Sequence, residues 1–326
     1  MLVIEDATLA DGRTRDVRVD RGAGRIDAIG RDLSGAETID ATGRRLLPGM
    51  VDVHVHFREP GFSHKETWKT GSRSAVAGGV TTVVDQPNTD PPTVTGAAVE
   101  AKAALAAGSV VDFGINGGVT AGWDPDSLLS APIAALGEVF LADSTGEMGI
   151  EESLFGEAIE RATEAGVTVT VHAEDADYFD EAARDAAGDG IGREADADAW
   201  SAYRTAEAER AAVKQACAVA GEAGARIHVA HTSTPEGIDA ASEAGMTCEV
   251  TPHHLLLSRD DLDDLGTFGR MNPPLRSESR RKAVYERVRE GAVEVIATDH
   301  APHTRAEKEA TILEAPSGVP GVETAL

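Results

Sequence analysis

From residue 50 to the C-terminus, short apolar runs typical of β-strands alternate with alanine-rich stretches typical of helices. The eight runs begin with MVDVHVHF (50–57) and end with VEVIATDH (293–300). Several helical stretches close on a glycine, as helix C-termini favour. Eight strands, each but the last seen with its helix, is the count of a (β/α)₈ TIM barrel. The sequence therefore predicts an α/β fold of this class over residues 50–326.

Residues 1–49 have a different pattern, in which short alternating runs such as LVIEDATL and DVRVD are broken by Gly and Asp. They predict small antiparallel strands that form one layer of a β-sandwich and end at Pro48-Gly49. The stretch GVPGVETAL (318–326) leaves no room for a last barrel helix or for strands that complete the sandwich. We expect either a fragment of a longer chain, which is favoured, or a partner over the gap. An open barrel would expose an apolar seam and favour association, for example as a homo-oligomer.

Charge excludes two classes of partner. The chain has 56 Asp and Glu against 30 Lys and Arg, a net charge of −26 spread along its whole length. Such a surface repels nucleic acid and anionic membranes. It favours an organism adapted to high salt, and the alternative is an ordinary acidic protein.

Cysteine usage and the N-terminus indicate the compartment. Cys217 and Cys248 lack C-x-x-C spacing, so neither a disulfide framework nor a thiolate metal site is expected. The stretch MLVIEDATLADGRTRD turns acidic by its fifth residue and has no apolar core of a signal peptide. No apolar run approaches the roughly 20 residues that a membrane span needs. These features predict a cytoplasmic protein.

Histidines and one aspartate lie where the predicted strands end. His54 and His56 end the first strand, His172 the fifth, His231 the sixth, and Asp299 the eighth. Active sites of such barrels gather at the C-terminal ends of the strands. Any one of these histidines alone is better explained as a structural residue, but their convergence favours a metal site. Imidazole and carboxylate form the ligand set that suits Zn²⁺.

The motifs around these residues resemble those of a known family. In order they are VDVHVHFREPG, TGSRSAVAGGVTTVVDQPNTDPPT, HAED, HVAHTST, EVTPHHL, MNPPLR and ATDHAPH. Together they resemble the dihydroorotase family of the amidohydrolase superfamily, from about Asp40 to the C-terminus. The resemblance implies two Zn²⁺ per subunit and the reversible hydrolysis of dihydroorotate to N-carbamoyl-aspartate by a metal-bridged hydroxide, a step of pyrimidine synthesis.

The resemblance also implies residue roles. His54, His56 and Asp299 would hold one ion, His172 and His231 the other, and Asp299 would transfer the proton in catalysis. A guanidinium suits the ring carboxylate of the substrate, which agrees with a role for Arg58. Ser317 stands where an aromatic side chain is frequent in the family. The expected substrate-binding residues are His56, Arg58, Asn88, Asn272, His303, Ser317 and Gly318.

One position departs from the pattern. Two neighbouring cations need a bridging carboxylate, which many relatives supply as a carboxylated lysine on the fourth strand. Here that strand reads LGEVFLADSTG and contains no lysine. Glu138 aligns with the lysine and is the favoured ligand, with Asp143 as the alternative.

Two other readings compete with dihydroorotase. Allantoinases and hydantoinases are close relatives, but those acting on allantoin tend to carry Asn at the position of Arg58. A catalytically inactive homologue that scaffolds aspartate transcarbamoylase is the second. Such proteins typically lose metal ligands, whereas all five expected here are present.

The charge distribution yields a first prediction. Because like charges repel less when counterions screen them, the free energy of unfolding should rise steeply from dilute buffer into concentrated KCl. Chemical denaturation at a series of KCl concentrations measures this. A stability that is indifferent to salt would exclude salt adaptation.

Overall fold

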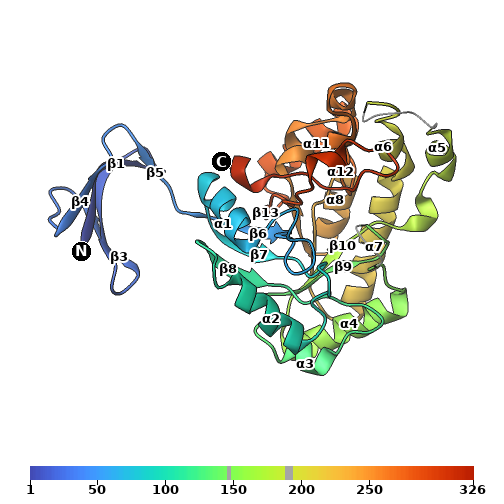
Figure 1. The fold of residues 1–326 in the computed structure, drawn as a ribbon, viewed down its shortest axis with the longest axis horizontal. Coiled ribbons are helices and arrows are strands. Elements are labelled where there is room, and N and C mark those ends of the chain that lie inside the picture. The colour runs from blue at the N-terminus through green and yellow to red at the C-terminus, as the bar shows by residue number, and fades with distance from the viewer. Residues whose placement is uncertain (145–147, 188–193) are drawn as a thin grey trace. The chain divides into compact units, whose positions relative to one another are not determined.

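The computed structural model describes residues 1–144, 148–187 and 194–326 (Figure 1). It divides into two compact units, Met1–Met50 and Val51–Leu326. None of the described helices is long and apolar enough to span a bilayer.

The N-terminal unit is one five-stranded sheet. Its strands are β1 (Leu2–Leu9), β2 (Thr14–Asp20), β3 (Arg25–Gly30), β4 (Glu37–Asp40) and β5 (Arg45–Leu46). β2 pairs antiparallel with β1 and β3, whereas β4 and β5 pair parallel with β1.

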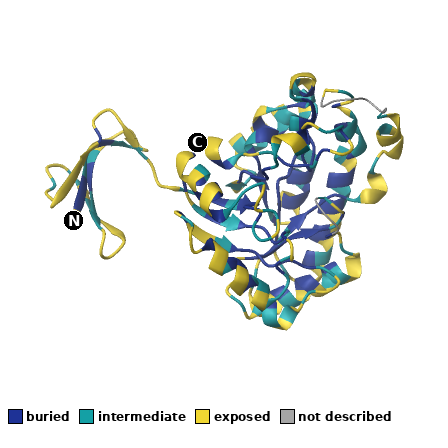
Figure 2. Ribbon diagram, in the orientation of Figure 1, coloured by how far each residue is buried: buried dark blue, intermediate teal, exposed yellow. Residues whose placement is uncertain are grey.

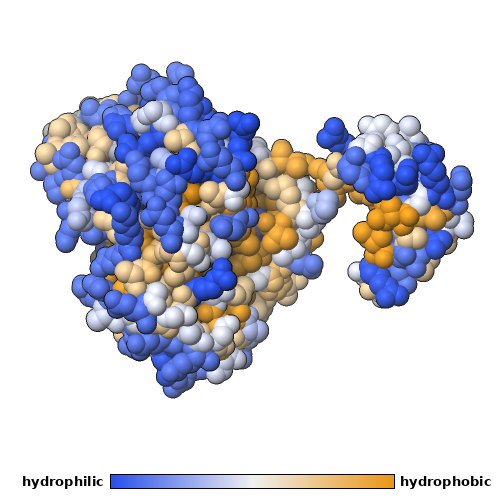
Figure 3. Space-filling model, turned by 180° about the vertical axis from the view of Figure 1, so that it is seen from behind, coloured by the Kyte–Doolittle hydropathy of each residue, from blue (hydrophilic) through white to orange (hydrophobic). Residues whose placement is uncertain are grey.

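The prediction of antiparallel strands was therefore wrong for β4, and β5 was not predicted. After β3 the chain returns to the start of β1, where the Ala36 N–H donates to the Met1 carbonyl (3.1 Å). It consequently runs alongside β1 in the same direction, as a crossover connection allows. Large aliphatic side chains, including Ile26 and Ile29, remain exposed on this sheet, and Figure 3 shows hydrophobic residues gathered on one face of the unit.

The C-terminal unit contains all eight strands predicted from residue 50 onward. They form two parallel sheets of order β6-β7-β8 and β9-β10-β11-β12-β13. Isolated parallel bridges pair Gly117, after β8, with Leu136 of β9, and Val55 of β6 with His300, after β13. The strands are β6 (Met50–Val55), β7 (Val80–Asp85), β8 (Asp112–Ile115), β9 (Leu136–Phe140), β10 (Val169–His172), β11 (Ile227–Val229), β12 (Thr247–Val250) and β13 (Val295–Ile296).

Six helices occupy the predicted helical stretches: α1 (Trp68–Ala77), α2 (Gly96–Ala106), α4 (Glu152–Ala165), α7 (Ala206–Glu222), α8 (Pro235–Glu243) and α11 (Glu278–Glu290). α4 and α11 end on Gly166 and Gly291 in the left-handed conformation, as the glycine pattern predicted. A helix was expected after every strand but the last, but no helical stretch was identified after β8, where α3 (Pro125–Leu129) has only five residues. Further short helices lie in the loops: α5 (Glu181–Ala186), α6 (Ala199–Tyr203), α9 (Pro252–Leu256), α10 (Leu262–Leu265) and α12 (Arg305–Lys308).

Alternation along the strands sorts the side chains into two layers. Val139, Val171 and Val229 are fully buried in the apolar core that the helices share, and Figure 2 shows these strands as the most buried part of the unit. Intervening residues face the other way. Glu138 and His228 lie there, so the polar residues of the strands face a common interior.

Candidate active site

The first strand presents its polar residues on one face, as its alternation predicted. Asp52, His54 and His56 are all buried, and Arg58 follows just beyond the strand. Asp52 accepts hydrogen bonds from the Thr298 N–H (3.1 Å) and hydroxyl (2.5 Å), which ties β6 to the segment after β13. This contact brings Asp299 next to His54 and His56.

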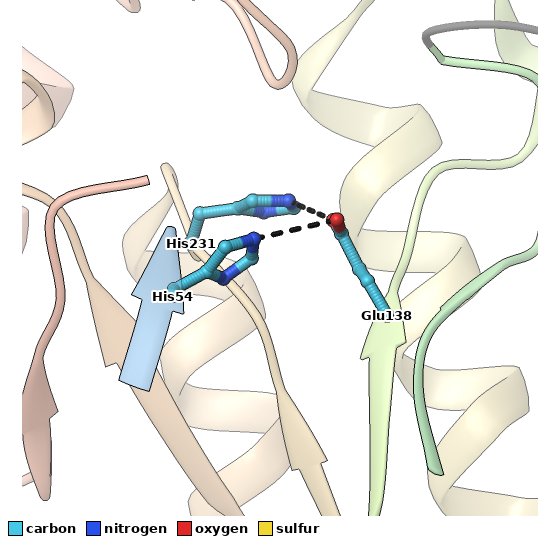
Figure 4. Close-up of side chains that lie close together, drawn as sticks. All are labelled: His54, Glu138 and His231. Atoms are coloured by element: carbon cyan, nitrogen blue, oxygen red, sulfur yellow. Dashed lines mark hydrogen bonds and ion pairs between the residues drawn. The ribbon is translucent and has the colours of Figure 1, made fainter. Parts of the chain in front are cut away.

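The Glu138 carboxylate lies among four imidazoles. Its Oε1 is 2.8 Å from His172 Nδ1 and 2.5 Å from His231 Nε2. Its Oε2 is 3.3 Å from His54 Nε2 and 4.0 Å from His56 Nε2. Figure 4 shows His54 and His231 pointing at Glu138 from different parts of the fold. Each carboxylate oxygen thus faces one pair of histidines.

Asp299 completes one side of this cluster. Its Oδ1 is 3.0 Å from His56 Nε2 and 3.6 Å from His54 Nε2. Two sets of three have ligand atoms within 4.8 Å of one another, which suits a shared cation: His54, Glu138 and His231, and His54, His56 and Asp299.

Three of the four histidines are oriented by acceptors on their other nitrogens, whereas His231 Nδ1 is buried without a hydrogen-bond partner among the described residues. His54 Nδ1 is 2.6 Å from Glu249, His56 Nδ1 is 2.7 Å from Asn88 Oδ1, and His172 Nε2 is 2.9 Å from Glu174. A proton on each of these nitrogens leaves the lone pair of the other nitrogen facing Glu138. His54 Nε2 is buried without a hydrogen-bond partner. The donor set therefore fits divalent cations such as Zn²⁺.

Burial and mutual contact set the charges of the cluster. Burial would raise the pKa of Glu138, but His231 and His54 hold that pKa well below its ordinary value. Burial would likewise lower the pKa of His172, but Glu138 and Glu174 raise it to about 9. Burial would also raise the pKa of Asp299, but the hydrogen bond with His56 and the charge of His54 lower it to about 2. Both carboxylates are thus ionised at neutral pH.

Two carboxylates around the cluster were not predicted. Glu249 on β12 contacts His54 and also accepts the His231 N–H (3.2 Å). Glu174 receives two hydrogen bonds from Arg204, at 3.0 and 2.6 Å, while it contacts His172. For Glu249 the sequence did offer a signal, namely a glutamate inside the apolar run MTCEV, because a charge in a buried strand requires a partner.

The backbone of Glu138 is fixed from two sides. Its N–H donates to Gln86 Oε1 (2.9 Å). Before it, Gly137 has φ +139°, and a Cβ there would lie 2.2 Å from Thr170 Oγ1 and 2.4 Å from the Thr170 carbonyl. Only glycine fits this approach of β9 to β10.

A cavity adjoins the cluster, and most of the predicted substrate residues line it: His56, Arg58, Asn88, Asn272, Ser317 and Gly318. His303 does not line it but is 2.8 Å from the Ser317 carbonyl. Arg58 is buried, and its Nε donates to the Pro302 carbonyl (3.1 Å). Burial lowers the pKa of Arg58 to about 10, which leaves it charged at neutral pH.

Asp143, the alternative ligand, is exposed and lies apart from the described metal-ligand groups. Its Oδ1 accepts the Gly149 N–H (2.7 Å). The geometry therefore favours Glu138 as the bridge.

Three site residues have positive φ angles: Arg58 (65°), His231 (30°) and Asp299 (47°). Non-glycine residues seldom adopt such angles, and those that do cluster at functional sites. In each case the turn follows a strand end.

Comparison with known proteins identifies relatives of the whole chain. A family described as "Dihydro-orotase-like" matches residues 43–237. A dihydroorotase of Halobacterium salinarum is 67% identical, with 100% of this chain and 75% of that protein covered. A dihydroorotase of Methanosarcina mazei is 44% identical, over 92% and 68% of the two chains. An allantoinase of Escherichia coli is 32% identical, over 100% and 75%.

Solved structures give the same architecture. The L-hydantoinase (dihydropyrimidinase) of Arthrobacter aurescens superposes with a TM-score of 0.88 at 26% identity, covering 99% of this chain and 75% of that one. The predicted α/β amidohydrolase fold is thus supported over the length of the chain.

The close packing at Gly137 yields a second prediction. Gly137→Ala should lower the free energy of unfolding by about 2–4 kcal/mol, because the added Cβ forces β9 away from Thr170. Gly166→Ala is the control, since its φ is also positive (+70°) but no atom lies within 4 Å of the added Cβ. That variant should lose only about 1 kcal/mol.

Urea denaturation of both variants measures the difference. Equal losses would show that the contact with Thr170 adds nothing to the cost of placing alanine at a positive φ.

Proposed function

The chain belongs to the dihydroorotase family, and on that premise we propose that it hydrolyses the cyclic amide of dihydroorotate reversibly to N-carbamoyl-aspartate. The observation that carries the proposal is the buried Glu138 carboxylate, with one oxygen toward each of two histidine pairs. We further propose that the two parallel sheets form one closed (β/α)₈ barrel around this cluster.

The residues present would hold two divalent cations, Zn²⁺ by the nature of the donors. His54, His56 and Asp299 would bind one, and His172 and His231 the other, with Glu138 between them. Such cations supply an activated water and polarise a carbonyl oxygen.

Asp299 is proposed to move the proton. Its carboxylate lies at the cavity wall and is ionised, so it can accept a proton from the attacking water. It would then return that proton to the ring nitrogen that leaves. The reverse reaction, ring closure, uses the same group in the opposite order.

Arg58 is proposed to bind the substrate carboxylate. Its guanidinium is charged, buried and at the cavity wall, where little water competes for it. Asn88 and Asn272 would add amide groups around the ring. Asn88 also contacts His56 at 2.7 Å, so substrate binding and cation binding share a side chain.

The competing readings have less support. Identity to the dihydroorotase of Halobacterium salinarum is 67%, against 32% to the allantoinase of Escherichia coli. An inactive scaffold would not need the buried set of histidines and carboxylates, which costs stability unless it binds cations.

An absorbance assay tests the function. Loss of the dihydroorotate amide band in high salt is expected with the purified chain. A chelator should abolish it, and added Zn²⁺ should restore it. Turnover of allantoin or hydantoin in place of dihydroorotate, or activity that persists without metal, would overturn the proposal.

A paired substitution tests the bridge. Glu138→Ala should remove bound metal and lower kcat by roughly 100-fold or more, since the cluster loses its shared ligand. Asp143→Ala is the matched control and should keep both. Metal analysis of each variant beside its kinetics measures this. Full metal content and activity in Glu138→Ala would assign the bridge elsewhere.

A further inference from the structure

One wall of the catalytic cavity is held from behind by a buried lysine. Lys308 ends α12, and its Nζ donates to the backbone carbonyls of Arg270 (2.9 Å), Pro316 (2.9 Å) and Gly318 (3.1 Å). An ammonium has three N–H donors, so three carbonyls use all of them. Two of these bonds hold the segment 316–318, in which Ser317 and Gly318 line the cavity. Lys308 itself does not line it.

The environment of Lys308 is unusual for a lysine. The residue is only 6% exposed, and no ion pair joins it to an acidic side chain of the described residues. Burial, and then the charge of Arg270, lower its pKa to about 7. The charged form of a buried lysine is costly without a carboxylate partner, so the three carbonyls are what stabilise the ammonium here.

The neighbouring side chains hold the same segment. The Ser317 carbonyl is 2.8 Å from His303 Nε2, so three consecutive carbonyls, 316 to 318, are bound by two side chains. Arg270 donates from Nε to Ser317 Oγ (3.3 Å), and its carbonyl accepts the Gly318 N–H (3.0 Å). The Arg270 guanidinium lies 3.6 Å from the centre of the Trp200 ring, which fixes it in turn.

Gly318 leaves no room for this segment to shift inward. Its φ is +128°, and a Cβ would lie 2.7 Å from both the Cβ and the carbonyl oxygen of Ala301. The segment is therefore packed on one side and bonded through its carbonyls on the other.

We propose that Lys308 is a positioning residue, which fixes residues 316–318 as the wall against which the substrate ring binds. The proposal rests on the proposed function, because it assigns these residues to the binding of dihydroorotate. Lys308 touches neither the cation ligands nor the cavity. Its loss should therefore weaken substrate binding and leave the chemical step intact.

Steady-state kinetics of Lys308→Ala test this. KM for dihydroorotate should rise about tenfold, which corresponds to about 1.4 kcal/mol of binding free energy, with kcat and metal content close to wild type. Propylammonium, which replaces the atoms removed, should restore KM. Lys69→Ala, at an exposed lysine of α1, is the control and should change neither constant.

Hydrogen exchange of the 312–318 segment gives a readout that does not need activity. Exchange should quicken in Lys308→Ala and not in Lys69→Ala. Lys308→Met, which keeps most of the length of the side chain but removes the N–H donors, replaces the alanine variant if that variant does not fold. An unchanged KM, a fall in kcat alone, or unchanged exchange in a folded variant overturns the assignment. If the wild-type chain were inactive on dihydroorotate, the proposed function would be refuted. The exchange experiment would still test whether Lys308 holds residues 316–318 in place.

Discussion

The arrangement of the site depends on one buried negative charge. Glu138 lies in a strand that is buried at every residue, and its carboxylate is stabilised only because imidazoles surround it. Three of those imidazoles are in turn held at an angle that directs a nitrogen inward. Glu249, Glu174 and Asn88 hold His54, His172 and His56 from other strands and loops. The need to pair one carboxylate thus organises contacts across both parallel sheets.

The sequence predicted the features of the site that depend on local patterns and missed those that depend on contacts between distant strands. Histidines at strand ends were predictable because strand alternation and the barrel rule both act locally on the chain. The structure brings together all six residues predicted as metal ligands. Glu249 and Glu174 were missed, since their role depends on which histidine nitrogen they face, and that is decided between distant strands. The sequence favoured Glu138 over Asp143 as the bridging ligand, and the burial of Glu138 and exposure of Asp143 agree with that preference.

The elements of the fold were likewise predictable where the sequence signal is local. The eight strands carry continuous apolar runs, and each was predicted from composition and punctuation. α3 was missed because five residues are too few to show a helical period. In the N-terminal sheet, β1 to β4 were predicted as strands, but β5 and the parallel direction of β4 were not. Direction depends on the route of a connection, and residues 31–36 carry no pattern that reveals it.

The residue at the centre of the cluster also bears on how the site is assembled. A lysine becomes a bridging carboxylate only after it reacts with dissolved carbon dioxide, and the adduct can revert. Glu138 carries its carboxylate from the moment of translation. On the assignment proposed here, cation loading is therefore independent of the bicarbonate supply, and the folded chain can take up its ions in carbon dioxide-free buffer without any prior chemical modification.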